Sequence, residues 1–267
     1  MKRVMISWIP NGLTMGNLCF GFFSMATAAY ATAEEDPVQR AAIFFASGIL
    51  ILIAACFDGL DGPVARKLGV SSPLGEQLDS LADLTTFGLA PGFLMFQMYL
   101  SDSSASPAWI TAPLSLPTGM MIAAIFPICA AFRLARFNVS HDPLVFTGLP
   151  SPVAGLFIAM LPILGKREIM IPTEGATAIF ITMSLLMVSN IKYRKPQAYV
   201  KGRFATFKII SFIIIITALF IFVKWHLVLF SVALLYIFSG LIAFFIFILQ
   251  KIAVRLNPRQ VIGKNDA

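Results

Sequence analysis

The sequence predicts an all-α membrane protein, a polytopic bundle of about eight transmembrane helices. Of its 267 residues, 58% are hydrophobic and 12% are charged, and the mean hydropathy is +0.85. The stretches 41–57 and 209–223 carry no charged side chain, and they are long enough, or nearly so, to cross a hydrocarbon layer about 30 Å thick. These observations exclude an ordinary soluble domain.

Eight apolar segments follow one another along the chain, at 12–31, 41–60, 78–100, 118–138, 150–164, 174–190, 207–223 and 226–249. The fifth segment is short and is bracketed by Pro152 and Pro162. We expect it to tilt or to borrow flanking residues.

Basic residues predict the orientation, because Lys and Arg accumulate in cytoplasmic loops. If the N-terminus is inside, the outer side holds four basic residues and the inner side the other 16 of the 20. The outer four are Arg40, Lys166, Arg167 and Lys224. Both termini are therefore predicted to face the cytoplasm. The net charge of +7 is expected to anchor the inner side to anionic lipid, and no nucleic-acid partner is predicted.

The first segment has some features of a secretory signal, since Lys2 and Arg3 precede an apolar run that ends in small residues. Asn11, Thr14 and Asn17 interrupt that run at helical spacing, and seven further spans follow it. The segment is therefore interpreted as a true first helix, with a cleaved signal as the alternative.

Four carboxylates between Asp58 and Asp83 stand out, because the chain has only 13 Asp and Glu residues. They follow the pattern D-x-x-D-G-x-x-A-R-x8-G-x3-D-x3-D. Acids in apolar surroundings are costly unless a cation or a reaction needs them. A solvated helix end would explain one or two aspartates, but not four at this spacing.

Helical spacing divides these acids between two helices. One face of the first helix carries Asp58, Asp61, Gly62 and Ala65. One face of the second carries Gly75, Asp79 and Asp83. Between them, residues 69–73 have turn composition, and Ser72 followed by Pro73 predicts an N-cap and a first helical residue.

Two such faces turned toward each other predict an all-oxygen site for Mg²⁺ or Mn²⁺. Four acids around two ions, about 3.5–4 Å apart, are the usual arrangement for phosphoryl chemistry. Arg66 lies one residue beyond the acid face, where it is expected to bind a phosphate. A metal-ion transporter would also need intramembrane acids, but near the bilayer midplane on broken helices, and it would not need these Gly, Ala and Arg positions.

This run resembles the signature of the CDP-alcohol phosphotransferases (class I phosphatidyltransferases), integral membrane enzymes of phospholipid synthesis. The match covers every defining position, namely Asp58, Asp61, Gly62, Ala65, Arg66, Gly75, Asp79 and Asp83. The resemblance implies two divalent cations held by Asp58, Asp61 and Asp79, with Asp83 sharing the second cation and acting as the base toward the acceptor alcohol. It also implies that Gly62, Ala65, Arg66 and Gly75 line a CDP pocket.

Outside the run, residues 5–200 resemble the bacterial type II phosphatidylserine synthases. Segment 10–17 is similar to their first helix, which implies that Asn11, Thr14 and Asn17 lie near the nucleotide. Segments 83–91, 133–138 and 148–152 also match. Serine carries a carboxylate, so its pocket needs a cation, and the expected contacts are Arg133, Arg136 and Asn138. Anchoring to lipid headgroups is the alternative for the two arginines.

The resemblance implies phosphatidyl transfer from CDP-diacylglycerol to L-serine, with CMP released on the cytoplasmic side of the inner membrane. Inositol, glycerol phosphate or choline as acceptor, and an archaeal-type ether-lipid donor, stay open as alternatives. Residues 1–200 are expected to form a six-helix catalytic core, 201–250 two additional C-terminal helices and 251–267 a basic cytoplasmic tail. The two additional helices are expected to face lipid or to form a dimer contact, and a homodimer is an expectation from the family.

Overall fold

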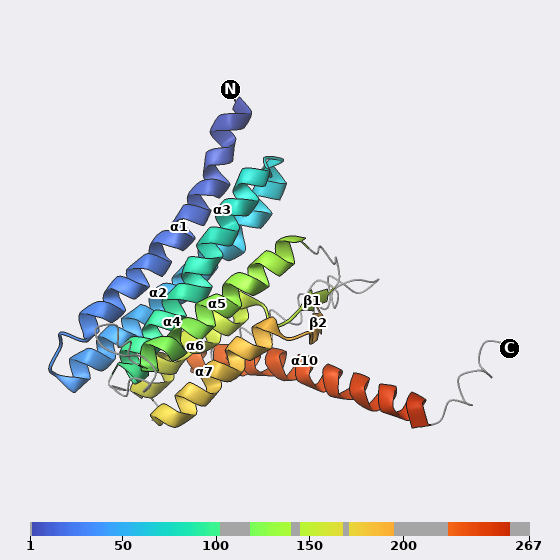
Figure 1. Cartoon of the computed structure of the whole chain (residues 1–267). Helices are drawn as coiled ribbons and strands as arrows, with labels where there is room; N and C mark the ends of the chain where they lie inside the picture. The colour runs from blue at the N-terminus through green and yellow to red at the C-terminus, as the bar shows by residue number, and fades with distance from the viewer. Residues whose placement is uncertain (1, 102–117, 140–144, 168–170, 195–223, 257–267) are drawn as a thin grey trace, which may run out of the picture. The chain divides into compact units, whose positions relative to one another are not determined.

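The structure, a computed structural model, describes residues 2–101, 118–139, 145–167, 171–194 and 224–256, which are almost entirely helical (Figure 1). Its helices are α1 (Lys2–Ala31), α2 (Pro37–Leu68), α3 (Pro73–Leu84), η1 (Thr85–Leu89), α4 (Ala90–Met95), η2 (Phe96–Leu100), α5 (Thr118–Val139), α6 (Ser151–Arg167), α7 (Thr173–Val188) and α10 (Trp225–Leu256). The chain divides into two compact units, one of residues 1–141 and 149–189 and the other of residues 142–148 and 190–267.

Seven of the eight predicted segments coincide with helices, and the segment 207–223 lies outside the described residues. Three described helices are long and apolar enough to cross a membrane, at Pro37–Leu68, Thr118–Val139 and Trp225–Phe245. Helices α6 and α7 are apolar but shorter. The number of eight spans and the side of the termini stay predictions.

The described residues are mostly helical, as the all-α prediction has it, and they add one short sheet that the sequence did not predict. Strands β1 (Val145–Thr147) and β2 (Lys192–Arg194) pair antiparallel in the second unit. Each strand has three residues, which is too short for an alternating pattern to predict it. Their pairing joins segments that are far apart in the sequence.

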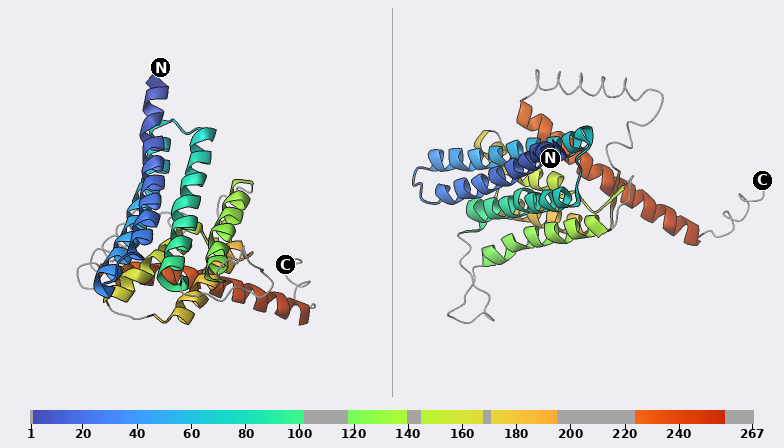
Figure 2. Two further views of the ribbon diagram at one scale, coloured as in Figure 1. Left: turned by 60° about the vertical axis from the view of Figure 1, so that its left-hand side comes forward. Right: turned by 90° about the horizontal axis from the view of Figure 1, so that it is seen from above.

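In the first unit, α1 and α2 lie side by side as an antiparallel hairpin (Figures 1 and 2). Asp36 caps α2, because its carboxylate accepts the N–H of Val38 at 3.0 Å, and Pro37 is the first helical residue. Near this turn, the buried hydroxyls of Ser24 and Ser47 lie 2.9 Å apart and hydrogen-bond across the two helices. The hairpin is thus held by polar contacts as well as by packing.

The third helical stretch runs without a break from α3 to η2 and alternates α-helical with π-helical turns. In η1 the N–H of Ala90 bonds to the carbonyl of Thr85, five residues back. Gly155 of α6 lies against this wide turn, since a Cβ on Gly155 would come 2.8 Å from the Cα of Phe87. Single π turns are frequent at functional sites, and the π turn η1 begins two residues after Asp83.

The core of the first unit is built where these helices meet. Phe87 and Leu94 are buried together with Phe44 and Ile51 of α2, and Ala159 of α6 completes the same cluster. Small residues let transmembrane helices approach closely, which strengthens their packing in the absence of a hydrophobic driving force. This packing fixes the position of the acid-bearing helices.

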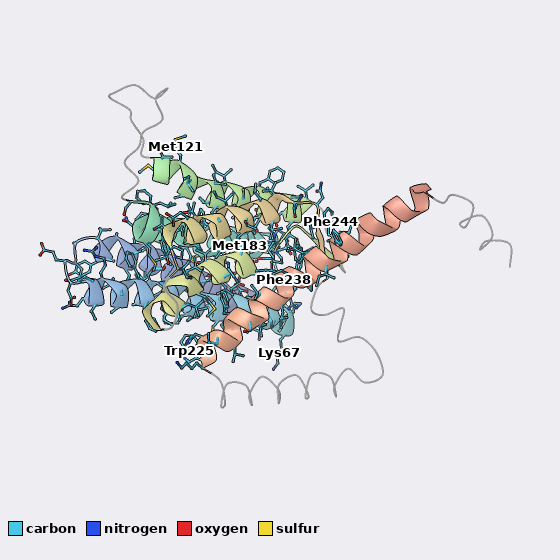
Figure 3. All side chains as sticks on the ribbon, turned by 90° about the horizontal axis from the view of Figure 1, so that it is seen from below. Lys67, Met121, Met183, Trp225, Phe238 and Phe244 are labelled. Carbon is cyan, nitrogen blue, oxygen red and sulfur yellow. The ribbon has the colours of Figure 1, made fainter. Side chains whose placement is uncertain are left out.

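In the second unit, Tyr193 of β2 packs against α10. Its ring is buried, stacks on Tyr236 with centroids 5.7 Å apart, and lies directly over Gly240. Phe238 and Phe244 project from α10 and are exposed (Figure 3). A helix that is apolar around most of its circumference is typical of a membrane span.

Candidate active site

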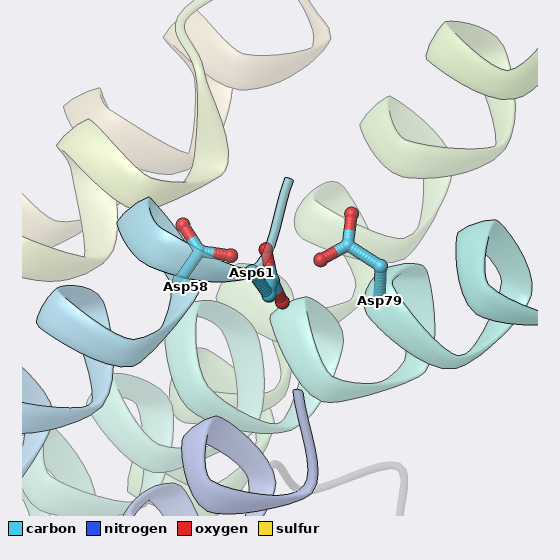
Figure 4. A group of neighbouring side chains, drawn as sticks. All are labelled: Asp58, Asp61 and Asp79. Carbon is cyan, nitrogen blue, oxygen red and sulfur yellow. The ribbon is translucent and has the colours of Figure 1, made fainter. Parts of the chain in front are cut away.

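Three of the four predicted metal ligands lie together where α2 ends and α3 begins. The ligand atoms of Asp58, Asp61 and Asp79 lie within 4.8 Å of one another. Figure 4 shows Asp79 on α3 reaching toward the two acids of α2. Hard cations bind oxygen at about 2.0–2.6 Å, so three carboxylates at this spacing can share one ion.

Asp83 lies one turn beyond Asp79, and its carboxyl group lies close enough to that of Asp58 for the two to interact. The Oδ1 atom of Asp83 is buried and accepts no hydrogen bond from the described residues. A buried acceptor without a donor is costly, and a divalent cation would satisfy it. The acids offer oxygen ligands only, which fits the chemistry of a hard divalent cation.

The carboxylate of Asp61 is held in place by its neighbours. Thr14 of α1 donates its hydroxyl to Oδ2 of Asp61 at 2.8 Å, and both side chains are buried. The N–H of Gly62 donates to Oδ1 at 2.6 Å. Hydrogen bonds of this kind orient metal-binding carboxylates, so α1 contributes to the acid cluster although it carries none of the four acids.

A first pocket of about 200 Å³ lies beside the acids, between α1, the end of α2 and the start of α3. Its walls include the predicted residues Asn11, Thr14, Asp61, Gly62, Ala65, Arg66, Gly75 and Asp79. Five further lining residues were not predicted to contact the nucleotide, namely Pro10, Val70, Ser71, Ser72 and Glu76, although Ser72 was predicted as the N-cap of the second acid-bearing helix. The turn that joins the two acid helices thus forms part of the wall.

The glycines of this pocket allow close approach of charged and polar groups. A Cβ on Gly62 would lie 3.3 Å from a guanidinium nitrogen of Arg66, so the arginine folds over this glycine. A Cβ on Gly75 would lie 3.5 Å from Oδ1 of Asn11. Ser72 accepts the N–H of Gly75 at 3.1 Å, which confirms the predicted N-cap.

Asn17, predicted near the nucleotide, does not line this pocket. It lies one turn beyond Thr14 on the same face of α1, and its side chain is fully buried. Its amide makes no hydrogen bond with the described residues, and its backbone carbonyl accepts the hydroxyl of Thr86 at 3.0 Å. Asn17 therefore belongs to the interior of the bundle, beneath the acids.

A second pocket of about 140 Å³ lies between α3 and the end of α5. Its walls are Glu76, Gln77, Asp79, Ser80, Asp83, Arg133, Leu134, Phe137 and Asn138. Arg133 is buried, donates to the hydroxyl of Ser151 at 3.1 Å, and interacts electrostatically with Asp83. Two of the three predicted acceptor contacts, Arg133 and Asn138, thus share a pocket with Asp83.

Arg136 is not among the residues that line the second pocket. Its guanidinium donates to the carbonyls of Met187, Val188 and Ser189 at 3.1–3.2 Å. These carbonyls belong to the last two residues of α7 and to its C-cap, where carbonyls have no partners within the helix. The two arginines, three residues apart, therefore face different surroundings.

The two pockets share a wall, because Glu76 and Asp79 line both of them. A ligand in the first pocket and a ligand in the second would meet at the acid cluster. This arrangement suits a direct transfer of a charged group between two bound molecules, in which positioning lowers the barrier. Ser80, which the sequence interpretation did not single out, follows Asp79 and lines the second pocket only.

A family model described as CDP-alcohol phosphatidyltransferase matches residues 7–245. The chain belongs to this family. It is therefore a membrane-bound transferase, and the match includes all four aspartates. The matched region also extends beyond residue 200 into α10, so the predicted boundary of the catalytic core stays a prediction.

Curated relatives of the chain carry the name CDP-diacylglycerol–serine O-phosphatidyltransferase. The protein of Mycobacterium leprae (strain TN) is 32% identical over 206 residues, which is 73% of this chain and 60% of that protein. The protein of Helicobacter pylori (strain ATCC 700392 / 26695) is 31% identical over 69% of this chain and 70% of its own length. The protein of Bacillus subtilis (strain 168) is 33% identical over 70% of this chain and 90% of its own length.

Proposed function

We propose that this phosphatidyltransferase transfers the phosphatidyl group of CDP-diacylglycerol to the hydroxyl of L-serine and releases CMP. The observation that carries the proposal is the shared wall at Asp79, where a pocket with Arg66 meets a pocket with Arg133. The names of the relatives from three bacteria support serine as the acceptor. Inositol, glycerol phosphate and choline are the competing acceptors.

Two divalent cations, Mg²⁺ or Mn²⁺, are proposed to bind Asp58, Asp61, Asp79 and Asp83. When bound, they would neutralise the charge of the pyrophosphate. The carboxylates themselves are positioned by α1 and by the packing of α3, so they need little rearrangement to accept cations. The clustering of three of these acids and the buried oxygen of Asp83 support this assignment.

The first pocket is proposed to hold the CDP part of the donor. Arg66 would bind a phosphate through charge-assisted hydrogen bonds. Asn11 and Thr14 on α1 would contact the nucleotide, and Gly62 and Gly75, which have no side chains, would leave space for it beside the acids. Ala65 completes the same wall, and a nucleotide contact of Asn17 stays a prediction.

The second pocket is proposed to hold serine. Arg133 would bind its carboxylate, and the hydroxyl would face Asp83. Asp83 then takes the hydroxyl proton as the serine oxygen bonds to the lipid-bearing phosphorus and the bond from that phosphorus to CMP breaks. No covalent intermediate with the protein is needed. Arg136 is proposed to act at a distance, by holding α7 against α5.

The chain is proposed to span the cytoplasmic membrane eight times, with both termini and the active site on the cytoplasmic side. Three regions predicted to be inside line the two pockets, namely the start of α1, the α2–α3 turn and the end of α5. Their common location supports the orientation predicted from basic residues. The chain is also proposed to form a homodimer, and its additional C-terminal helices are proposed to contact membrane lipid.

An acceptor panel tests the proposed function. Purified protein is supplied with CDP-diacylglycerol, Mg²⁺ or Mn²⁺, and serine, inositol, glycerol phosphate or choline in turn, and the lipid product is identified by its mass. We expect phosphatidylserine and an equal amount of CMP, with both lost when a chelator removes the cation. A lipid product with inositol but not with serine would overturn the assignment of serine as the acceptor. A parallel assay with an ether-linked CDP-lipid tests whether the donor is CDP-diacylglycerol or an archaeal-type ether lipid.

A further inference from the structure

Ser80 and Asn138 join α3 to α5 at the second pocket. The amide nitrogen of Asn138 donates to the hydroxyl oxygen of Ser80 at 3.0 Å, and the amide oxygen lies 3.4 Å from the same atom. The hydroxyl oxygen of Ser80 is also 3.1 Å from the backbone carbonyl of Glu76. All three residues line the pocket, so this small network is part of its wall.

The network orients the amide of Asn138. A serine hydroxyl has one hydrogen to donate and can accept from another group. The carbonyl of Glu76 takes the hydrogen at 3.1 Å, and the hydroxyl oxygen accepts the shorter contact from the amide nitrogen of Asn138. The amide oxygen of Asn138 keeps acceptor capacity at the pocket, although the side chain itself is exposed and would otherwise turn freely.

The pocket thereby offers one group for each polar part of a hydroxy amino acid. Arg133 can bind a carboxylate, Asp83 can accept the proton of a hydroxyl, and the amide oxygen of Asn138 can accept a hydrogen bond from an ammonium group. Choline has a quaternary nitrogen with no hydrogen to donate, and inositol and glycerol phosphate have no ammonium group. The amide oxygen would therefore favour an amino acid over these alcohols.

We propose that Ser80 is a specificity-determining positioning residue, which holds the amide of Asn138 so that its oxygen accepts a hydrogen bond from the ammonium group of the acceptor. This inference rests on the proposed function of the second pocket. Ser80 acts through Asn138 and does not take part in the transfer.

The test compares Michaelis constants in Ser80→Ala, Asn138→Ala and the double variant. Each single change should raise the KM for L-serine about tenfold and leave the KM for CDP-diacylglycerol unchanged, because one hydrogen bond is lost in one pocket. In the double variant the KM for L-serine should also rise about tenfold and no further, since both changes remove the same contact. Ser80→Thr keeps a hydroxyl and should retain the wild-type KM for serine.

Two controls separate recognition from general packing. Thr85→Ala removes a hydroxyl that bonds to the carbonyl of Leu81 at 3.0 Å in the same helical stretch but lines neither pocket, so its KM for serine should not change. As a competitive inhibitor, 3-hydroxypropionate has the carboxylate and hydroxyl of serine but no ammonium group. Its inhibition constant should be equal in the wild type and Ser80→Ala.

The outcomes distinguish the two levels of the proposal. If the wild type uses serine and Ser80→Ala has an unchanged KM for serine, this inference is wrong and the proposed function stands. A rise in both Michaelis constants would assign Ser80 to the packing of α3 and also overturn the inference. A wild type that releases CMP with another alcohol and not with serine overturns the proposed function, and this inference with it.

Discussion

Single side chains around the acid cluster give its carboxylates different hydrogen-bonding surroundings. Asp61 receives hydrogen bonds from Thr14 and from the N–H of Gly62, whereas Oδ1 of Asp83 receives none from the residues described. The first carboxylate is thus held in one orientation, and the second keeps a buried oxygen without a donor, which suits the roles proposed for them as metal ligand and base.

Replacing Thr14 by Val removes the hydrogen bond to Asp61 with little change in volume. We expect the cation concentration that gives half-maximal CMP release to rise about tenfold, because partners that orient metal ligands are typically worth 10–100-fold in affinity. Titration with Mn²⁺ measures this. Thr182→Val, which removes a hydroxyl bonded within α7, serves as the matched control, and an equal shift in both variants would argue against the prediction.

Asp83→Asn keeps the shape of the side chain and removes its ability to take a proton. We expect CMP release to fall by about 10²–10⁴-fold, the usual contribution of a general base, while the folded protein still binds CDP-diacylglycerol. Binding of the donor and the single-turnover rate are measured separately. Near-normal turnover in this variant would remove Asp83 from the role of base.

At the level of helices, Arg133 and Arg136 of α5 have different contacts although they lie three residues apart. Arg133 lies in the second pocket, and Arg136 holds the last carbonyls of α7. Lys cannot reproduce a planar fork of donors. We expect Arg136→Lys to lower the melting temperature and to change the KM for serine less than twofold, and Arg133→Lys to raise that KM. A raised KM for serine in Arg136→Lys, with only a lowered melting temperature in Arg133→Lys, would assign the serine contact to Arg136 instead.

The contact between α6 and the π turn η1 is equally specific. A Cβ on Gly155 would come 2.8 Å from the Cα of Phe87, whereas a Cβ on Gly165 of the same helix would meet only Met98, at 3.9 Å. We expect Gly155→Ala to destabilise the protein by about 1–3 kcal/mol, the usual cost of overpacking. Gly165→Ala should be neutral or slightly stabilising, since Ala favours helix by about 1 kcal/mol. Thermal unfolding in detergent compares them.

The helices that carry the acids could be predicted from the sequence because their signals are local. Apolar length, the spacing of the aspartates and the Ser72 cap all depend on nearby residues. The π turn at η1, the pairing of β1 with β2 and the bonds from Arg136 to α7 depend on segments more than 40 residues apart in the chain. Ser80 carried a weak local signal, a hydroxyl one residue after Asp79, but its partner Asn138 could not be predicted from spacing.

At the scale of the whole molecule, the proposed orientation in the membrane can be tested directly. Helix α2 has 32 residues, which at about 1.5 Å per residue is enough to separate its two ends by a bilayer. In a variant without native cysteines, we expect Ser71→Cys to react with a membrane-impermeant maleimide only after the cells are permeabilised. Glu35→Cys, at the other end of α2, should react in intact cells. The reverse labelling would invert the topology.

The wall shared by the two pockets has a consequence for how such enzymes diversify. The first pocket, proposed to hold the nucleotide of the donor, is lined by α1, α2 and the start of α3, whereas one side of the second pocket comes from a few residues at the end of α5. Changes confined to 133–138, together with position 80, could therefore exchange one polar headgroup for another while the donor half is inherited intact. The same scaffold would then yield different phospholipids from a single activated precursor.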